Sequence, residues 1–278
     1  MTRRVIKMPT PAGIGAGQTA SVNLPLGLTY HALFLRMNVQ AGDPAAAVDV
    51  PAADWGDYLD EIRVQVNGDT TIRIDAADLV KLNQFYGVSL VAGTLPLYLG
   101  RPWMRTIGGE DQTAYKTNGG IASLTVEIEV KTGVTVNSLV LYAQQGPGVT
   151  DQGMPLGWGP HLEINKFVHN QGVTGDAEIS DIPRSAYSMM AMHFNTAAIT
   201  GIEVTVDNRK VIENDKAIRD ALAATIDRVP QSGMTHIDFL TEDRLIEALP
   251  MAVQDFRLKP TFTATGNFTI YAEAIKGA

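Results

Sequence analysis

Four carboxylates that lie close together in the sequence are the residues best suited to hold a metal ion. Asp54, Asp57, Asp60 and Glu61 form the densest acidic run of the 278-residue chain. Carboxylate oxygens are ligands that Ca²⁺ accepts, so this run is a weak candidate for a calcium site. A solvated acidic loop explains the same run without a metal ion, and it is the simpler interpretation.

Histidine and cysteine are too sparse for a zinc site or a catalytic thiol. The chain has no Cys and 5 His, and no two His have the spacing of an HExxH motif. Neither a G-x-S-x-G nucleophile elbow nor a Walker phosphate loop occurs. His31 and His193 lie in apolar stretches and are expected to be structural. The sequence therefore predicts no catalytic residue, no required cofactor and no enzyme activity.

Asp75 and Asp78 resemble a general acid–base pair, yet their setting favours helix capping. Leu79, Leu82 and Tyr86 follow at helical spacing. A carboxylate at a helix N-terminus accepts hydrogen bonds from the free N–H groups of the first turn. We therefore expect a short amphipathic helix that these two carboxylates stabilise.

A β-hairpin is predicted directly before this helix. Ile62, Val64 and Val66 alternate with polar residues, which is the period of a half-buried strand. Asn67-Gly68 is a strong signal for a type I′ turn, because both central residues need positive φ. Strand, turn, strand and helix thus follow one another over residues 60–86.

The same unit occurs again later in the chain. Residues 202–206 alternate, Asp207-Asn208 supplies a turn, and Asn214 or Asp215 can cap a helix over the residues that follow. Flanking features recur in the same order, namely Leu24-Pro25 and Ile182-Pro183, Tyr30 and Tyr187, and Tyr142 and Tyr271. We therefore expect two copies of one antiparallel β-sandwich domain.

The domain boundaries follow from composition. Residues 1–18 are rich in Gly, Pro and Ala and are expected to form an arm with little regular structure. Residues 19–146 form the first domain, a Gly/Pro-rich linker occupies 147–160, and 161–278 form the second domain. Residues 40–57 and 101–120 are expected to be long loops. Trp158, in the linker, is expected to pack on a domain or on another subunit.

Charge and hydropathy narrow the possible partners. The net charge of −8, from 22 basic and 30 acidic residues, argues against specific nucleic-acid binding. No apolar run approaches the ~20 residues of a membrane span, and the first ten residues lack the apolar core of a signal peptide. Arg3, Arg4 and Lys7 form either a solvated arm or a contact to phosphates, those of a lipid surface or of nucleic acid.

Several stretches carry a resemblance to a known family. They are Ala16–Tyr30, Asn165–Arg184 with its E-I-x-D-[IL]-P-R end, Gln254–Lys259 and Tyr271–Glu273. In this order the chain resembles the major capsid protein of corticoviruses, which are tailless icosahedral phages with an internal membrane. The resemblance covers nearly the whole chain, and none of its motifs is catalytic.

The resemblance implies an all-β double jelly roll with two antiparallel eight-stranded jelly rolls, and the short helix predicted after an internal hairpin would then belong to each of them. It implies a homotrimer whose pseudo-hexagonal capsomers tile an icosahedral shell around the membrane. Implied partners are neighbouring capsomers, vertex (penton) proteins and membrane proteins of the virion, with the arm at Arg3, Arg4 and Lys7 near lipid. The subunit would be made in the bacterial cytoplasm, and structural calcium is a property of the family.

The alternative function is a binding module. Jelly rolls also serve as carbohydrate- or receptor-binding domains. A carbohydrate site would need exposed aromatic side chains, and the only Trp residues are Trp55, Trp103 and Trp158. A tight trimer that assembles into shells favours the capsid function, whereas a glycan-binding monomer favours the alternative.

Overall fold

The structure, a computed structural model, describes residues 3–41 and 46–277. The chain divides into two compact units, which are described separately. Unit 1 contains residues 1–84 and 88–162, and unit 2 contains residues 85–87 and 163–278. No helix among the described residues is long and apolar enough to cross a membrane.

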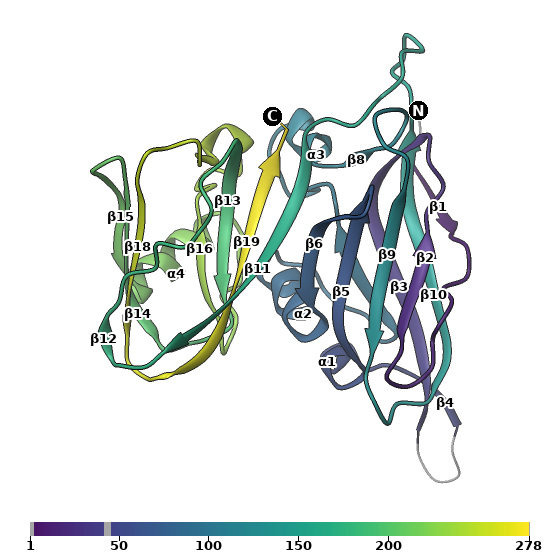
Figure 1. The fold of residues 1–278 in the computed structure, drawn as a ribbon, viewed down its shortest axis with the longest axis horizontal. Helices are drawn as coiled ribbons and strands as arrows, with labels where there is room; N and C mark the ends of the chain where they lie inside the picture. The colour runs from purple at the N-terminus through teal and green to yellow at the C-terminus, as the bar shows by residue number, and fades with distance from the viewer. Residues whose placement is uncertain (1–2, 42–45, 278) are drawn as a thin grey trace. The chain divides into compact units, whose positions relative to one another are not determined.

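Unit 1 is built mainly of antiparallel strands (Figure 1). Its strands are β1 (Arg4–Lys7), β2 (Thr19–Asn23), β3 (Leu28–Ala41), β4 (Ala46–Asp49), β5 (Leu59–Val66), β6 (Asp69–Asp75), β7 (Thr94–Tyr98), β8 (Tyr115–Lys116), β9 (Leu124–Val130) and β10 (Val136–Pro147). Its helices are α1 (Trp55–Tyr58), α2 (Ala76–Phe85), which ends in unit 2, and α3 (Ile107–Gln112). One sheet has the order β1-β10-β3-β4, with β7 and β8 also on β3. In the other, β5 lies between β6 and β9, and β2 pairs with β9.

Unit 2 has the same construction. Its strands are β11 (His161–Gln171), which begins in unit 1, β12 (Gly175–Asp176), β13 (Tyr187–Phe194), β14 (Ile199–Val206), β15 (Arg209–Asp215), β16 (Thr235–Asp238), β17 (Leu249–Pro250), β18 (Phe256–Phe262) and β19 (Gly266–Lys276). They are joined by helix α4 (Lys216–Thr225) and the 3₁₀ turn η1 (Leu245–Glu247). One sheet has the order β16-β13-β19-β11, and the other has the order β12-β18-β14-β15.

Alternation of apolar and polar residues explains how each unit forms a core. Along β9, Leu124, Val126 and Ile128 are buried while the residues between them are half-buried. In unit 2, strand β13 is rich in Met, and its Met189 and Met192 are buried and pack with side chains of the opposite sheet. Each unit therefore has the two-layer form that such sequences favour.

The predicted hairpin–helix repeat is confirmed in detail. β5 and β14 have 8 residues each, β6 and β15 have 7, and α2 and α4 have 10. Both hairpins have a β-bulge at the equivalent place, after Val64 and after Val204. Asn67 (φ 54°) and Asp207 (φ 46°) begin the two turns in the left-handed region, which the I′ geometry requires.

The Tyr–Pro correspondence is also structural. The Tyr30 hydroxyl donates a hydrogen bond to the Pro25 carbonyl at 2.5 Å, and the Tyr187 hydroxyl donates one to the Pro183 carbonyl. Burial raises the pKa of both phenols to about 12. In both units, a tyrosine hydroxyl on the long strand (β3 or β13) therefore bonds to a proline carbonyl in the segment before that strand.

Three expectations need correction. Residues 4–7 of the arm form β1, which pairs with β10, because β10 offers an edge that the sequence alone does not reveal. Within the predicted 40–57 loop, β4 and α1 are regular elements, and residues 42–45 lie outside the described part. The predicted 101–120 loop contains α3, whose first turn is capped by Thr106.

Trp158 packs on unit 1, which is the first of the two expected alternatives, namely a domain of the same chain or another subunit. Its ring lies edge-on to Tyr115, with 5.1 Å between centroids, and 4.3 Å from the ring of His161. The segment predicted as a linker, residues 147–160, lies in unit 1.

Candidate functional site

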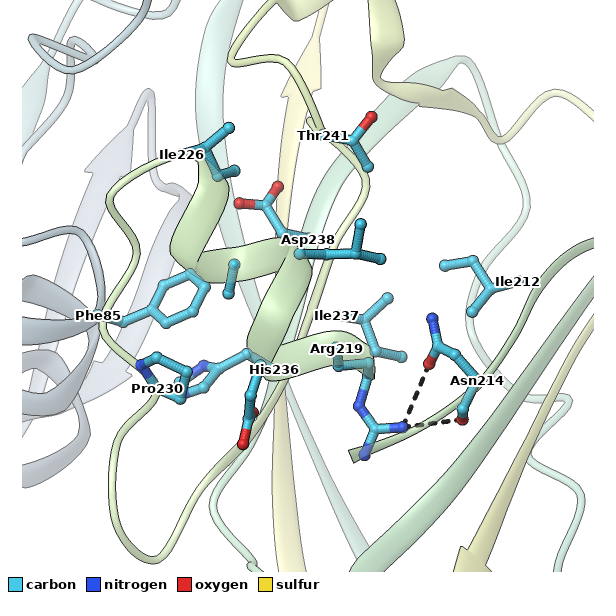
Figure 2. Close-up of a pocket in the computed structure, with 13 residues that line it drawn as sticks. Phe85, Ile212, Asn214, Arg219, Ile226, Pro230, His236, Ile237, Asp238 and Thr241 are labelled. Carbon is cyan, nitrogen blue, oxygen red and sulfur yellow. Dashed lines mark hydrogen bonds between the residues drawn. The ribbon is translucent and has the colours of Figure 1, made fainter. Parts of the chain in front are cut away.

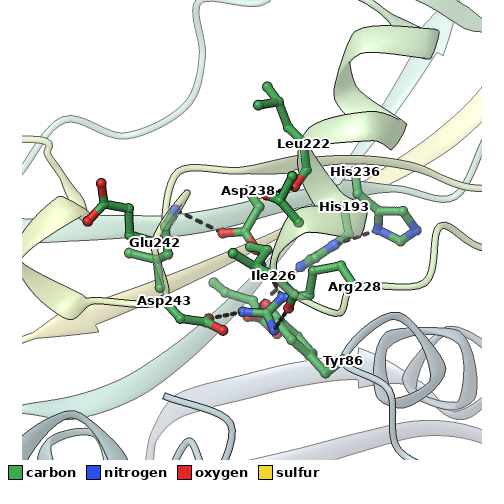
Figure 3. A network of polar contacts seen from close by, with 12 residues as sticks. Tyr86, His193, Leu222, Ile226, Arg228, His236, Asp238, Glu242 and Asp243 are labelled. Carbon is green, nitrogen blue, oxygen red and sulfur yellow. Dashed lines mark hydrogen bonds and ion pairs between the residues drawn. The ribbon is translucent and has the colours of Figure 1, made fainter. Parts of the chain in front are cut away.

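A group of buried charges lies in unit 2, around Arg228 (Figure 3). The Arg228 side chain is 2% exposed and follows α4. Its Nε donates to Oδ2 of Asp238 at 3.2 Å, and its Nη2 forms an ion pair with Asp243. Its guanidinium lies 4.8 Å from the ring centre of Tyr86, a distance at which cation–π attraction operates.

Burial governs the electrostatics of this cluster. Removal from water raises the pKa of Asp238 to about 6, although Arg228 opposes the shift by stabilising the carboxylate. A buried arginine that lacked its carboxylates would be strongly destabilising. The cluster therefore fixes the end of β16 at Asp238 and the following loop at Asp243 against Arg228, which follows α4.

Two histidines meet beside this cluster. Residues 193 and 236 are directly opposed on β13 and β16, and the Nδ1 atoms of His193 and His236 lie 2.7 Å apart. At that distance one ring must donate and the other accept, so the pair shares one proton. Phe85 stacks on His236 with 4.1 Å between ring centroids, and Tyr86 donates from its hydroxyl to Glu273 at 2.5 Å.

A small pocket lies under α4, next to these groups (Figure 2). Phe85, Ile212, Ile226 and Ile237 contribute apolar walls, and Arg219 lies at one side. The cavity volume is about 50 Å³, whereas sites for small organic ligands usually enclose about 300 Å³ or more. The pocket is therefore a packing gap in unit 2 and is too small for a cofactor.

In the acidic run predicted as a weak metal candidate, two carboxylates lie beside basic side chains. Glu61 is buried, and its Oε1 accepts hydrogen bonds from Arg63 at 3.1 Å and Arg73 at 2.9 Å. Asp60 lies 3.6 Å from Lys131. Asp54 and Asp57 lie at and within the short helix α1. Over residues 3–41 and 46–277, no three His, Cys, Asp or Glu side chains are grouped to hold a metal ion.

The basic arm is partly anchored. Arg3 forms an ion pair with Asp111 at 2.5 Å and lies 3.7 Å from Glu110. The Nδ1 of His31 lies 3.1 Å from the same Asp111 carboxylate, and burial, together with Arg3, lowers the pKa of His31. Arg4 and Lys7 are exposed on β1. His31 is thus a buried structural residue, as expected.

The two predicted helix caps have different outcomes. Asp215 caps α4, since its side chain accepts from the Ile218 amide at 3.0 Å. For α2, the capping role of Asp75 stays a prediction, and Asp78 is buried and lies 3.9 Å from Lys81.

Sequence reasoning missed the Arg228 cluster and the histidine pair. Both depend on which residues face each other across β13 and β16, and local patterns do not determine that register. The one usable signal was that His236 stands in an alternating apolar stretch, where a polar ring needs a partner.

Two family profiles match almost the entire chain. The viral coat protein P2 N-terminal domain matches residues 5–146, and the viral coat protein P2 C-terminal domain matches residues 162–278. The major capsid protein P2 of Pseudoalteromonas phage PM2 is 22% identical over 266 residues, which is 92% of this chain and 91% of that protein.

Solved structures show the same architecture. The crystal structure of the PM2 protein superposes with a TM-score of 0.84 and 21% identity, over 99% of this chain and 97% of that chain. The major capsid protein of Sulfolobus Turreted Icosahedral Virus superposes with a TM-score of 0.69 and 12% identity, over 100% of this chain and 97% of that chain.

Two antiparallel sandwiches with a repeated hairpin and helix, shared with these proteins, define a double jelly-roll fold. The buried charges around Arg228 and around Glu61 bind one another and are structural. The chain belongs to the viral coat protein P2 family. It is a major capsid protein, a component of a bacteriophage virion, and not an enzyme.

Proposed function

We propose that this capsid subunit works as a homotrimer whose capsomers tile an icosahedral shell around an internal membrane. The observation that carries the proposal is the duplication, since each unit has two layers of antiparallel strands and the same hairpin–helix. Three copies with two similar units each provide six similar units around a threefold axis, which is a pseudo-hexagonal capsomer.

Light scattering after size-exclusion chromatography tests this oligomeric state. We expect a mass three times the 29.9 kDa of the chain, stable on dilution, because permanent interfaces bury about 2,000 Å² or more. Electron microscopy of concentrated trimers should then show sheets or shells. A monomer that remains monomeric at capsid-forming concentrations would contradict the proposal.

Further partners follow from a membrane-containing shell. The subunit would contact neighbouring capsomers, vertex (penton) proteins and membrane proteins of the virion, after synthesis in the bacterial cytoplasm. The net charge of −8 argues against a specific contact with nucleic acid. Structural calcium would act between neighbouring capsomers of the shell, because the described residues within one chain offer no grouped ligands.

Contact with lipid headgroups would fall to Arg4 and Lys7. Both are exposed on β1, whereas Arg3 is engaged by Asp111. Each basic side chain near an anionic surface contributes ~1 kcal/mol to binding. Replacing both with Glu should abolish co-sedimentation of trimers with vesicles that contain phosphatidylglycerol, while the matched change of exposed Arg244 and Arg209 to Glu should not. Equal co-sedimentation of both variants would exclude this role for the arm.

A further inference from the structure

Helix α4 has an unusual orientation, because it buries a charged side chain and exposes apolar ones. Arg219 is only 8% exposed, while Ile218 is 53% and Leu222 46% exposed. The buried guanidinium is held from below, since Nη1 donates to the Asn214 carbonyl at 3.1 Å and Nη2 donates to the Ile199 carbonyl at 3.4 Å. Figure 2 shows Arg219 directed towards Asn214, on the inner side of the helix.

The exposed side chains form one continuous stripe. Ala217, Ile218, Ala221 and Leu222 are all exposed, and residues one turn apart lie on the same side of a helix. We call these four residues the α4 face. A surface helix normally turns such a stripe towards the core, so an apolar stripe exposed in this way marks a contact site.

The equivalent helix of unit 1 buries two of the four corresponding positions, while Ala77 is exposed and Lys81 is half-buried. Since α2 and α4 both have 10 residues after equivalent hairpins, Asp78 and Leu82 hold the positions of Ile218 and Leu222. Asp78 is 5% and Leu82 2% exposed. These two positions are therefore buried in the first repeat and exposed in the second.

We propose that unit 1 of a second copy covers the α4 face in the capsomer. This inference rests on the proposed homotrimer. A cyclic trimer makes head-to-tail contacts between two different surfaces, and in a ring of six alternating units each unit 2 adjoins unit 1 of the next copy. In that arrangement Ile218 and Leu222 would be buried, as the equivalent positions of α2 are.

The charges around the α4 face favour a protein partner. Lys216 forms an ion pair with Asp220, and Asp215 accepts from the helix N-terminus. The apolar stripe therefore has a nearly neutral polar border, which is the composition of a protein interface with an apolar centre and a polar rim. Nucleic acid and anionic lipid need unpaired basic side chains, and α4 supplies none beyond the paired Lys216 and the buried Arg219.

A charge-introducing variant tests the contact. In the full chain, Ile218→Asp with Leu222→Asp should weaken trimer association at least about 100-fold, because two charges would enter an apolar interface centre. The matched control is Ile246→Asp in η1, where the side chain is 92% exposed, and it should leave the trimer intact. Circular dichroism should show the same fold for all three proteins.

Light scattering over a dilution series separates the outcomes. A trimeric wild type and control with a monomeric double variant supports the inference. A trimeric double variant at wild-type affinity overturns it while leaving the trimer itself established. A wild type that is monomeric contradicts the proposed function instead.

A cross-link covers the case in which the double variant does not fold. Since the chain has no Cys, Leu222→Cys provides one thiol for a benzophenone maleimide. In trimers formed from mixed light and ¹⁵N-labelled chains, the photo-cross-link should join residue 222 to a unit 1 peptide of the other isotope. Cross-links confined to peptides of the same chain, or to no peptide, would overturn the inference.

Discussion

Individual side chains hold the two hairpin turns in place in the same way. Asn67 accepts from the Ala122 and Ser123 amides at 2.6 and 3.2 Å. Asp207 accepts from the Gln254 and Asp255 amides at 2.9 and 2.8 Å. Asn67→Ala and Asp207→Ala should each lower the free energy of unfolding by about 1–2 kcal/mol, because two amides lose an acceptor and Ala disfavours positive φ.

Urea unfolding measures these losses. The matched control is Asp207→Asn, which keeps an acceptor oxygen and tolerates the left-handed backbone, so it should remain within about 0.5 kcal/mol of the wild type. Alanine variants as stable as the wild type would show that the side-chain bonds to the neighbouring loop contribute nothing.

Asp238 should make the stability of the protein depend on pH. Its pKa is raised from 3.8 to about 6 by burial, so the folded state binds this proton more tightly than the unfolded state. The stabilisation is complete below about pH 4 and is lost as the pH rises through 6. Asp238→Asn removes this dependence, so the stability of the wild type relative to the variant should fall by at most about 3 kcal/mol between pH 4 and 7.

Urea unfolding at several pH values between 4 and 7 measures how the free energy of unfolding of each protein depends on pH. Asp151→Asn, an exposed site, serves as the control and should follow the wild-type pH dependence. If the free energies of unfolding of the wild type and Asp238→Asn changed equally with pH, the raised pKa of Asp238 would be contradicted.

At the scale of elements, α4 depends on its N-cap. Asp215→Ala should lower the free energy of unfolding by about 1 kcal/mol, because the Ile218 amide loses its acceptor. Asp215→Ser retains a capping oxygen and should recover most of the loss in thermal or urea unfolding. If Ala and Ser gave the same stability, the cap would not stabilise the helix.

The hairpins and helices could be predicted because their signals are local. Asn67-Gly68 and Asp207-Asn208 specify turns by their tolerance of positive φ, and Asp215 specifies a helix start. The strand β1 and the contact of His193 with His236 could not be predicted, because they depend on the partner strand and its register. The inward position of Arg219 was equally hidden, since its acceptors are backbone carbonyls that only the folded chain brings together.

At the scale of the whole molecule, each subunit should fold without a metal ion. Glu61 is occupied by two arginines, and the described residues contain no grouped metal ligands. Adding EDTA or 5-fold molar Ca²⁺ to purified trimers should therefore shift Tm by less than about 1 °C, since a ligand stabilises only by binding the native state. Mg²⁺ is the matched control ion. A calcium-specific rise in Tm would place a calcium site within the trimer.

A cryo-electron microscopy reconstruction of the purified protein tests the central claim most directly. We expect three chains around a threefold axis, with six β-sandwiches in a pseudo-hexagonal ring. The α4 face should be covered by unit 1 of the next copy. Single chains, or an assembly without threefold symmetry, would contradict the capsomer.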